Sequence, residues 1–208
     1  MNILGLDLGT KKTGWSIFKD DKLVDYGVIS CDHKNVRVRT LTIRDEIKKL
    51  IESNDINRAV VEELKVGFGG GMSNFNTVVT LAVLQGCVLG LCIDYDVEFI
   101  TYDPSVWRKL TEVNRKRIEC KTCGWLDEFI AGEGITECPK CGESRKSYLK
   151  TYLLNKRLDL KQTAVDIVNQ KYGLKLVFYP RDTKKNISND DIAEAILIAQ
   201  AHIYECNL

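Results

Sequence analysis

The sequence predicts a mixed α/β fold, because two periodicities alternate along its 208 residues. Three short apolar segments joined by tight turns come first, at residues 2–8, 13–18 and 22–30, as in an antiparallel meander of strands. Segments with helical spacing follow and alternate with further strand-like segments. The composition is 44% hydrophobic and 28% charged, which is typical of a globular protein and excludes a disordered or fibrous chain.

The segments after the meander favour the order helix, strand, helix, strand. Residues 36–53 have apolar side chains at helical spacing, and the sequence Arg-Ala-Val-Val-Glu at 58–62 is typical of a buried strand. A glycine-rich loop at 67–71 precedes an apolar helix at about 73–92, and residues 97–101 favour another strand. We therefore expect a mixed central sheet with flanking helices.

The second half of the chain indicates a core that is interrupted by an insertion. Pro104 opens a short helix, and the composition changes at about Arg115, where a cysteine-bearing segment begins. Helical spacing returns around Leu160, and residues 189–204 form a long apolar helix. We expect the core to comprise residues 1–114 and 147–208, and the insertion to comprise residues 115–146.

Charge and hydropathy limit the partners and the location that the sequence favours. The formal net charge of +1 indicates neither a nucleic-acid nor an anionic-membrane partner, so any such partner must be inferred from local charge. No apolar run reaches the ~20 residues that span a bilayer. The chain starts Met-Asn-Ile-Leu without a basic leader. We expect a cytoplasmic protein with no membrane partner.

Two Cys-x-x-Cys-Gly motifs lie in the predicted insertion. Cys120 and Cys123 form the first, Cys138 and Cys141 form the second, and fourteen residues separate them. This spacing lets four thiolates enclose a tetrahedral Zn²⁺ ion, with no coordination position left for catalysis. A segment this short buries little apolar surface, so metal binding would supply its folding energy. We expect a structural zinc ribbon; rubredoxin-like iron and four unrelated thiols are the alternatives.

Carboxylates occur in apolar segments, where an unpaired charge is costly. Asp7 lies within the first strand, whereas Glu62 and Glu63 end a later strand and point to opposite faces, so at most one of them joins Asp7. Asp191 and Glu194 share one face of the last helix. Carboxylates brought together repel one another, and Mg²⁺ or Mn²⁺ relieves that repulsion. Paired ions of this kind hydrolyse phosphodiesters.

Three motifs then carry a family resemblance: Ile-Leu-Gly-Leu-Asp-Leu-Gly-Thr-Lys-Lys-Thr-Gly-Trp at 3–15, Val-Val-Glu before a helix containing Leu-Gln-Gly, and Asp-Ile-Ala-Glu-Ala at 191–195. In this order they resemble the RuvC family of Holliday junction resolvases. The resemblance implies an RNase H-like fold and a homodimer that cuts four-way DNA junctions with two Mg²⁺ or Mn²⁺ ions per active site. It assigns the catalytic, metal-binding acids to Asp7, Glu62, Asp191 and Glu194.

Two departures from the family pattern affect these assignments. The last acid is usually aspartate in the family, so Glu194 leaves Asp190 as a substitute ligand. Asp190 and Asp191 taken alone also suit the first turn of a helix, where they complement its dipole. The zinc ribbon is absent from the common bacterial form, although RNA-guided transposon nucleases carry a comparable element in their RuvC-like domains.

Basic residues on both sides of the insertion indicate where DNA would bind. They gather at 108–117 and at 145–161, and phosphate neutralisation would use both stretches, although solvated helix faces are the alternative. Within these stretches, Lys109 and Lys161 resemble basic positions that contact phosphate near the family's active site.

The glycine-rich loop and the helix after it indicate a junction probe and a dimer interface. Phe68 is the best match to the apolar or aromatic residue that probes the junction centre in the family. The helix at 73–92 is apolar nearly all round, which predicts burial by the sheet on one side and by a partner on the other. The resemblance implies that this partner is a second copy, since a twofold dimer matches the symmetry of a junction.

The leading hypothesis is a metal-dependent, structure-specific DNA endonuclease that resolves four-way junctions, with the breadth of other branched substrates left open. The alternatives are a YqgF-like nuclease of RNase H fold acting on RNA, an actin-like or sugar-kinase-like ATPase, and a non-enzymatic DNA-binding module. The ATPase would need a second phosphate loop that the sequence lacks, and the binding module would leave the acidic set unexplained.

Overall fold

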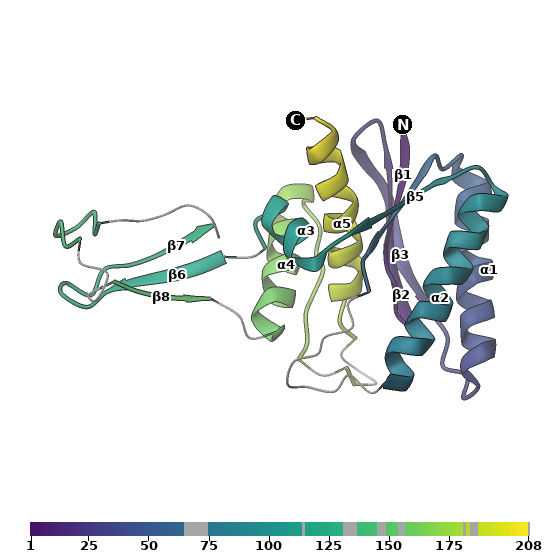
Figure 1. Ribbon diagram of the computed structural model, residues 1–208, viewed down its shortest axis with the longest axis horizontal. Coiled ribbons are helices and arrows are strands. Elements are labelled where there is room, and N and C mark those ends of the chain that lie inside the picture. The colour runs from purple at the N-terminus through teal and green to yellow at the C-terminus, as the bar shows by residue number, and fades with distance from the viewer. Residues whose placement is uncertain are drawn as a thin grey trace.

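A computed structural model of the chain shows a five-stranded sheet with helices on both faces and a separate three-stranded sheet that projects from this core (Figure 1). The structure describes residues 1–64, 75–113, 115–130, 137–144, 149–153, 157–180, 182–183 and 187–207.

The central sheet is mixed, as the sequence predicts, and has the strand order β3-β2-β1-β4-β5. The central strand β1 (Asn2–Asp7) pairs antiparallel with β2 (Lys12–Lys19) and parallel with β4 (Arg58–Glu62). The two edge strands are β3 (Lys22–Ser30) and β5 (Glu98–Tyr102). Because β1 and β4 are parallel, their carboxyl ends meet at the same side of the sheet, and Asp7 and Glu62 both lie there.

Helices cover the two faces of the sheet and enclose two hydrophobic clusters. On one face, α1 (Val36–Asn54) and α2 (Phe75–Asp94) pack over a cluster that includes Leu6 and Val61. The opposite face is covered by α3 (Pro104–Leu110), α4 (Arg157–Tyr172) and α5 (Asp190–Cys206). Each core segment for which the sequence predicts a helix or strand contains one.

Helix α5 is buried along almost its whole length and lies directly against β1 and β2. A Cβ atom on Gly14 would lie 1.9 Å from the carbonyl oxygen of Asp191, and one on Gly5 would lie 2.3 Å from that of Ala195. The Ser16 hydroxyl donates a hydrogen bond of 3.0 Å to the same Ala195 carbonyl. Only glycine permits this approach, because any side chain would overlap the helix backbone.

The second sheet has the order β7-β6-β8, with all neighbours antiparallel. Its strands are β6 (Arg115–Cys120), β7 (Leu126–Ile130) and β8 (Leu149–Leu153). The sequence places the end of the insertion at residue 146, which falls before β8. Since β8 pairs only with β6 in the described sheet, we propose that the insertion extends over residues 115–153.

We expect Gly14→Ala to lower the free energy of unfolding by about 2–3 kcal/mol, the cost of overpacking a closed interior. The added methyl group meets helix backbone, which cannot rotate away. Urea unfolding at fixed protein concentration measures the effect. Ser53→Ala in α1 is the control, because Ser53 is exposed on the surface of that helix. Alanine there should stabilise the helix by less than ~1 kcal/mol. Equal urea concentrations at the midpoint of unfolding for the two variants would contradict the interpretation.

Candidate active site

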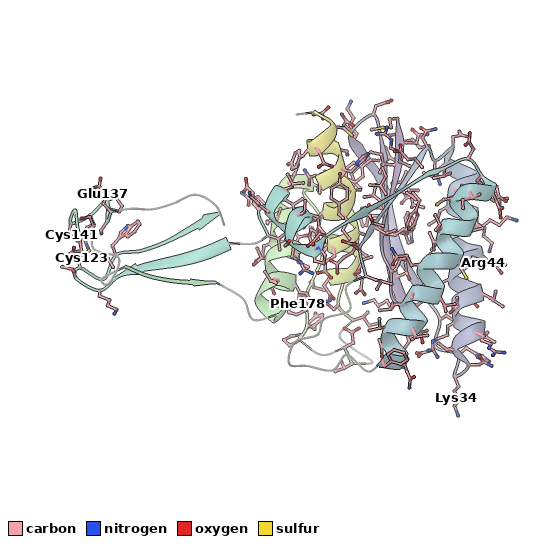
Figure 2. The ribbon with its side chains drawn as sticks, in the orientation of Figure 1. Lys34, Arg44, Cys123, Glu137, Cys141 and Phe178 are labelled. Carbon is pink, nitrogen blue, oxygen red and sulfur yellow. The ribbon has the colours of Figure 1, made fainter. Side chains whose placement is uncertain are left out.

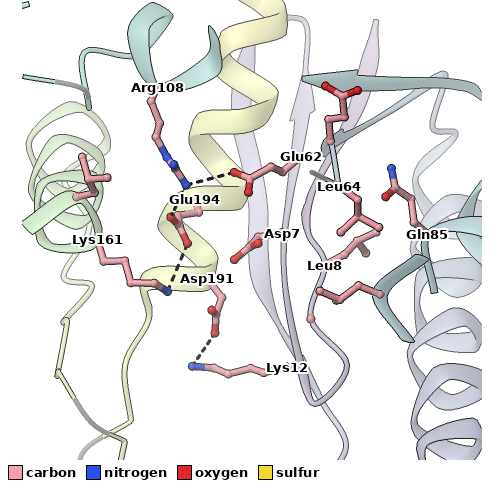
Figure 3. A pocket seen from close by; sticks show the side chains of 14 residues that line it. Asp7, Leu8, Lys12, Glu62, Leu64, Gln85, Arg108, Lys161, Asp191 and Glu194 are labelled. Carbon is pink, nitrogen blue, oxygen red and sulfur yellow. Dashed lines mark hydrogen bonds and ion pairs between the residues drawn. The ribbon is translucent and has the colours of Figure 1, made fainter. Parts of the chain in front are cut away.

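A cavity of about 640 Å³ opens at the edge of the sheet where β1 and β4 end (Figure 3). Acidic and basic side chains from both sheet and helices line it. The acids are Asp7 at the end of β1, Glu62 at the end of β4, and Asp191 and Glu194 on the first turns of α5; the bases are Lys12, Arg108 and Lys161.

The structure brings all four predicted acids to this cavity, and it distinguishes Glu62 from its neighbour. The Glu62 carboxylate accepts a hydrogen bond from the indole N–H of Trp107 at 2.7 Å, and it lies 3.4 Å from Nη2 of Arg108. Glu63 is exposed at the rim, and its backbone N–H donates to Tyr102. Strand alternation therefore directs Glu62, rather than Glu63, towards the helices that carry the other acids.

Asp7 is the acid with the least compensated charge. Burial raises the pKa of Asp7 well above its usual range, and the nearby carboxylates of Glu194, Asp191 and Glu62 raise it further. The cavity's three cations form ion pairs with the other acids and none with Asp7. A buried carboxylate in this position favours an additional cation.

Three cations lie around the remaining carboxylates and pair with them (Figure 3). Lys12 Nζ is 2.8 Å from Asp191 Oδ2, and Lys161 Nζ is 3.5 Å from Glu194 Oε2. Arg108 Nη2 bridges the two sides of the cavity, 3.4 Å from Glu62 and 3.8 Å from Glu194. These pairs neutralise the acids only in part, because burial still raises the pKa of both Asp191 and Glu194.

The donor set of the cavity fits divalent cations. All four acids offer hard oxygen ligands, which suit Mg²⁺ or Mn²⁺. The carboxylates are not a single tight cluster: among the described residues, only the four cysteines of the insertion place at least three ligand atoms within 4.8 Å of one another. Wider spacing suits ligands that serve two ions about 3.5–4 Å apart.

Asp190 belongs to a neighbouring cavity of about 440 Å³ and does not line the one that contains Asp7. Its carboxylate pairs with Lys161 Nζ. Burial opposes the charged form of Asp190, but hydrogen bonds from Lys161 and Ser188 lower its pKa overall. This geometry favours Glu194 as the acid that completes the set, with Asp190 as the partner that holds Lys161.

Comparison with known proteins assigns the family. Residues 3–114, more than half of the chain, match the family model described as "Crossover junction endodeoxyribonuclease RuvC". The chain belongs to the RuvC family. It is therefore an endodeoxyribonuclease of the crossover junction type, and like the family it depends on divalent metal ions. This result favours neither the YqgF-like nuclease nor the ATPase.

Individual RuvC proteins are similar over much of their length. The protein from Ehrlichia canis is 30% identical over 113 residues, which are 52% of this chain and 69% of the relative. The protein from Nitratidesulfovibrio vulgaris is 25% identical over 136 residues, which are 64% of this chain and 78% of the relative. The solved structure "T. thermophilus RuvC in complex with Holliday junction substrate" superposes with a TM-score of 0.59 at 15% identity and covers 100% of this chain and 95% of that one. The RNase H-like fold of the RuvC proteins is thus present here.

Two of the three residues predicted to contact DNA lie within the part of the chain that the structure describes, and only one of these two lines the cavity. Lys161 lines the cavity, but Lys109 is exposed on α3 and does not. The adjacent Arg108 lines the cavity instead. The sequence placed Arg108 only within the basic stretch at 108–117, and it did not single out Lys12. The helical phase of α3 is the signal that would have identified Arg108, since it follows the buried Trp107. Phe68 lies outside the described residues.

The four cysteines of the insertion converge at one site, near the end of the second sheet that lies away from the core (Figure 2). Cys120 Sγ is 3.7 Å from Cys141 Sγ, and Cys123 Sγ is 3.6 Å from Cys138 Sγ. Each motif ends in a glycine with positive φ, Gly124 at 68° and Gly142 at 70°, as the tight turn of a zinc knuckle requires. The RuvC match ends at residue 114, before this segment.

The thiols of this cluster cannot all ionise without a cation. Although burial opposes ionisation of Cys120, the amides of Cys123 and Thr122 lower its pKa to about 7. The amide of Glu143 favours the Cys141 thiolate, but burial and the three neighbouring thiols raise the pKa of Cys141 to about 12. The cluster therefore fits a soft divalent ion that neutralises several thiolates together.

Proposed function

We propose that this RuvC-family endonuclease resolves four-way DNA junctions by metal-dependent phosphodiester hydrolysis, with Asp7, Glu62, Asp191 and Glu194 as the metal ligands. The observation that carries the proposal is the convergence of four carboxylates from β1, β4 and α5 at one cavity, in which burial and the neighbouring acids raise the pKa of Asp7. The similar structure of T. thermophilus RuvC, which was determined in complex with a Holliday junction substrate, supports the choice of substrate.

The chain's own residues supply the ligands and the cations that the reaction requires. Two Mg²⁺ or Mn²⁺ ions held by these acids would activate water and stabilise the leaving oxygen. Lys12, Arg108 and Lys161 now pair with the carboxylates, and each would exchange its carboxylate for a phosphate oxygen of DNA in the cavity. We also propose that Phe68 contacts the junction, as does Lys109, which does not line the cavity.

We propose a homodimer through α2. Leu84, Val88 and Leu91 bury one side of this helix against the sheet, whereas Val83 is 54% exposed on the other side. An exposed apolar stripe of this kind marks an interaction site, and a second copy would place two active sites on the two strands of a junction. By length and composition α2 is also the one described helix that could cross a membrane, with 22% of its most apolar window buried. Its packing on the sheet favours the protein interface, and we propose a cytoplasmic enzyme.

We propose that the cysteine cluster holds a structural Zn²⁺ ion that folds the insertion. The second sheet lies between α3, which carries Arg108, and α4, which carries Lys161. The fold of the insertion therefore sets the direction in which these two helices enter the core, and with it the placement of two cations of the cavity.

Removing the charge of Asp7 tests the proposed function. Asp7→Asn should lower the rate of junction cleavage in Mg²⁺ on the order of 10³-fold, because several kcal/mol of transition-state charge stabilisation are lost with the ion. Junction binding should persist, since the cations remain. Glu63→Gln is the matched control, a carboxylate at the rim that should cleave at the wild-type rate. Near wild-type cleavage by Asp7→Asn would refute the assignment of the metal site.

The double substitution Cys138→Ser and Cys141→Ser should release about one zinc ion per chain, because two of the four thiolate ligands are lost. Atomic absorption measures the metal. We expect junction affinity to fall about tenfold, the effect of one lost charge-assisted phosphate contact. Mn²⁺ binding to the core should be retained, since the four acids lie outside the insertion. Unchanged affinity after verified zinc loss would make the insertion dispensable for DNA binding.

The dimer is tested by placing a charge on the exposed face of α2. Val83→Glu should shift the protein from dimer to monomer in sedimentation velocity at micromolar concentration, because the carboxylate would be buried in the interface. Val24→Glu on β3 is the control: Val24 is 52% exposed, close to the 54% of Val83, but lies on a different surface. A wild-type protein that sediments only as a monomer would exclude the proposed interface.

A further inference from the structure

The indole of Trp107 contacts the proposed metal ligand Glu62 from inside the protein. Trp107 is 0% exposed and belongs to the hydrophobic cluster beneath α5. Its Nε1–H donates a hydrogen bond of 2.7 Å to Glu62 Oε2. Within the described part of the chain, no donor contacts the other oxygen, Oε1. One carboxylate oxygen is thus held by the core, and the other is left for the cavity.

The backbone fixes this contact in register. Glu62 pairs with Tyr102 in the β4–β5 ladder, and the N–H of Glu63 donates to the Tyr102 carbonyl at 2.8 Å. Helix α3 begins two residues later, with the Asp103 side chain accepting from the Ser105 N–H at its start. The Thr111 hydroxyl donates to the Trp107 carbonyl at its end. Both partners of the hydrogen bond are therefore placed by the same pair of strands.

Arg108 contacts the same carboxylate oxygen but is a different kind of partner. Its guanidinium lies 4.9 Å from the centre of the Trp107 ring and 3.4 Å from Glu62 Oε2, and it also faces Glu194. Arg108 lines the open cavity and carries a charge that phosphate attracts, so it is free to exchange partners. Trp107 is enclosed by the core, and its N–H is a donor that neither titrates nor changes orientation.

We propose that Trp107 is a positioning residue for Glu62: it holds Oε2 so that Oε1 faces the metal when Arg108 turns to the DNA. This inference rests on the proposed function, because it needs Glu62 to be a metal ligand. A phenylalanine would fill much of the same volume, but it has no N–H group for Oε2. Partners of this kind commonly contribute 10–100-fold to metal affinity.

The test removes the N–H group and keeps the ring. Trp107 is replaced by β-(3-benzothienyl)alanine, in which sulfur takes the place of the indole N–H, and Trp107→Phe serves as the genetically encoded companion. Mn²⁺ binding to the DNA-free protein is measured by calorimetry. We expect affinity about tenfold weaker, with the unfolding temperature of the analogue protein little changed. In cleavage assays the Mn²⁺ concentration for half-maximal rate should rise, and saturating Mn²⁺ should restore most of kcat.

The same analogue at Trp15 is the control, because Trp15 packs in the other hydrophobic cluster. It should leave Mn²⁺ affinity unchanged. Unchanged affinity for the Trp107 analogue would overturn the inference, as would a loss of rate that saturating Mn²⁺ does not restore.

Glu62→Gln separates this inference from the proposed function. If Glu62→Gln abolishes Mn²⁺ binding while the Trp107 analogue has no effect, only the positioning role fails. If Glu62→Gln leaves Mn²⁺ binding unchanged, the ligand assignment itself fails. Combining both changes should weaken binding no further than Glu62→Gln alone, since Trp107 acts through that carboxylate.

Discussion

The approach of α5 to the central sheet is the constraint on which the active site depends. Gly5 and Gly14 let the helix backbone lie against β1 and β2, at distances that would place any Cβ atom inside it. The first turns of α5 carry Asp191 and Glu194, and the sheet edge carries Asp7 and Glu62. A helix displaced outward by the width of a methyl group would separate these two pairs of acids. Gly5 and Gly14 are thus required for the geometry of the site as well as for the packing of α5 on the sheet.

The close approach of α5 to the sheet also brings like charges together, which is electrostatically unfavourable in the folded state. Burial and mutual repulsion raise the pKa of Asp7, and the ion pairs of Lys12, Arg108 and Lys161 compensate the other acids only in part. A ligand that binds the folded state and not the unfolded chain stabilises the fold by mass action. Divalent ions in the cavity would therefore contribute to stability as well as to catalysis, which links the two properties in this enzyme.

Local patterns predicted the elements of the core, and the resemblance to the RuvC family assigned the four acids. Asp7 and Glu194 are conspicuous because each lies in an apolar segment, whereas the pattern alone leaves Glu62 and Glu63 as alternatives. The Cys-x-x-Cys spacing identifies the second candidate metal site. Contacts between distant elements were not predictable in this way. Arg108 and Lys109 differ only in the phase of a seven-residue helix, and the pairing of Asp190 with Lys161 depends on how α4 meets α5. The sequence places the end of the insertion at residue 146 because β8 has no cysteine, and the pairing of β8 with β6 is the basis for proposing a later end.

The pairing of β6 with β8 has a consequence for how the insertion joins the core. Lys116 lies opposite Leu153, so the chain leaves the core and returns to it at neighbouring points. Adjacent strands are only about 5 Å apart, and a segment whose ends lie this close can be accommodated in a loop without separating the elements on either side of it. The three-stranded sheet with its cysteine cluster is thus joined to the core at one place, as a separate unit would be.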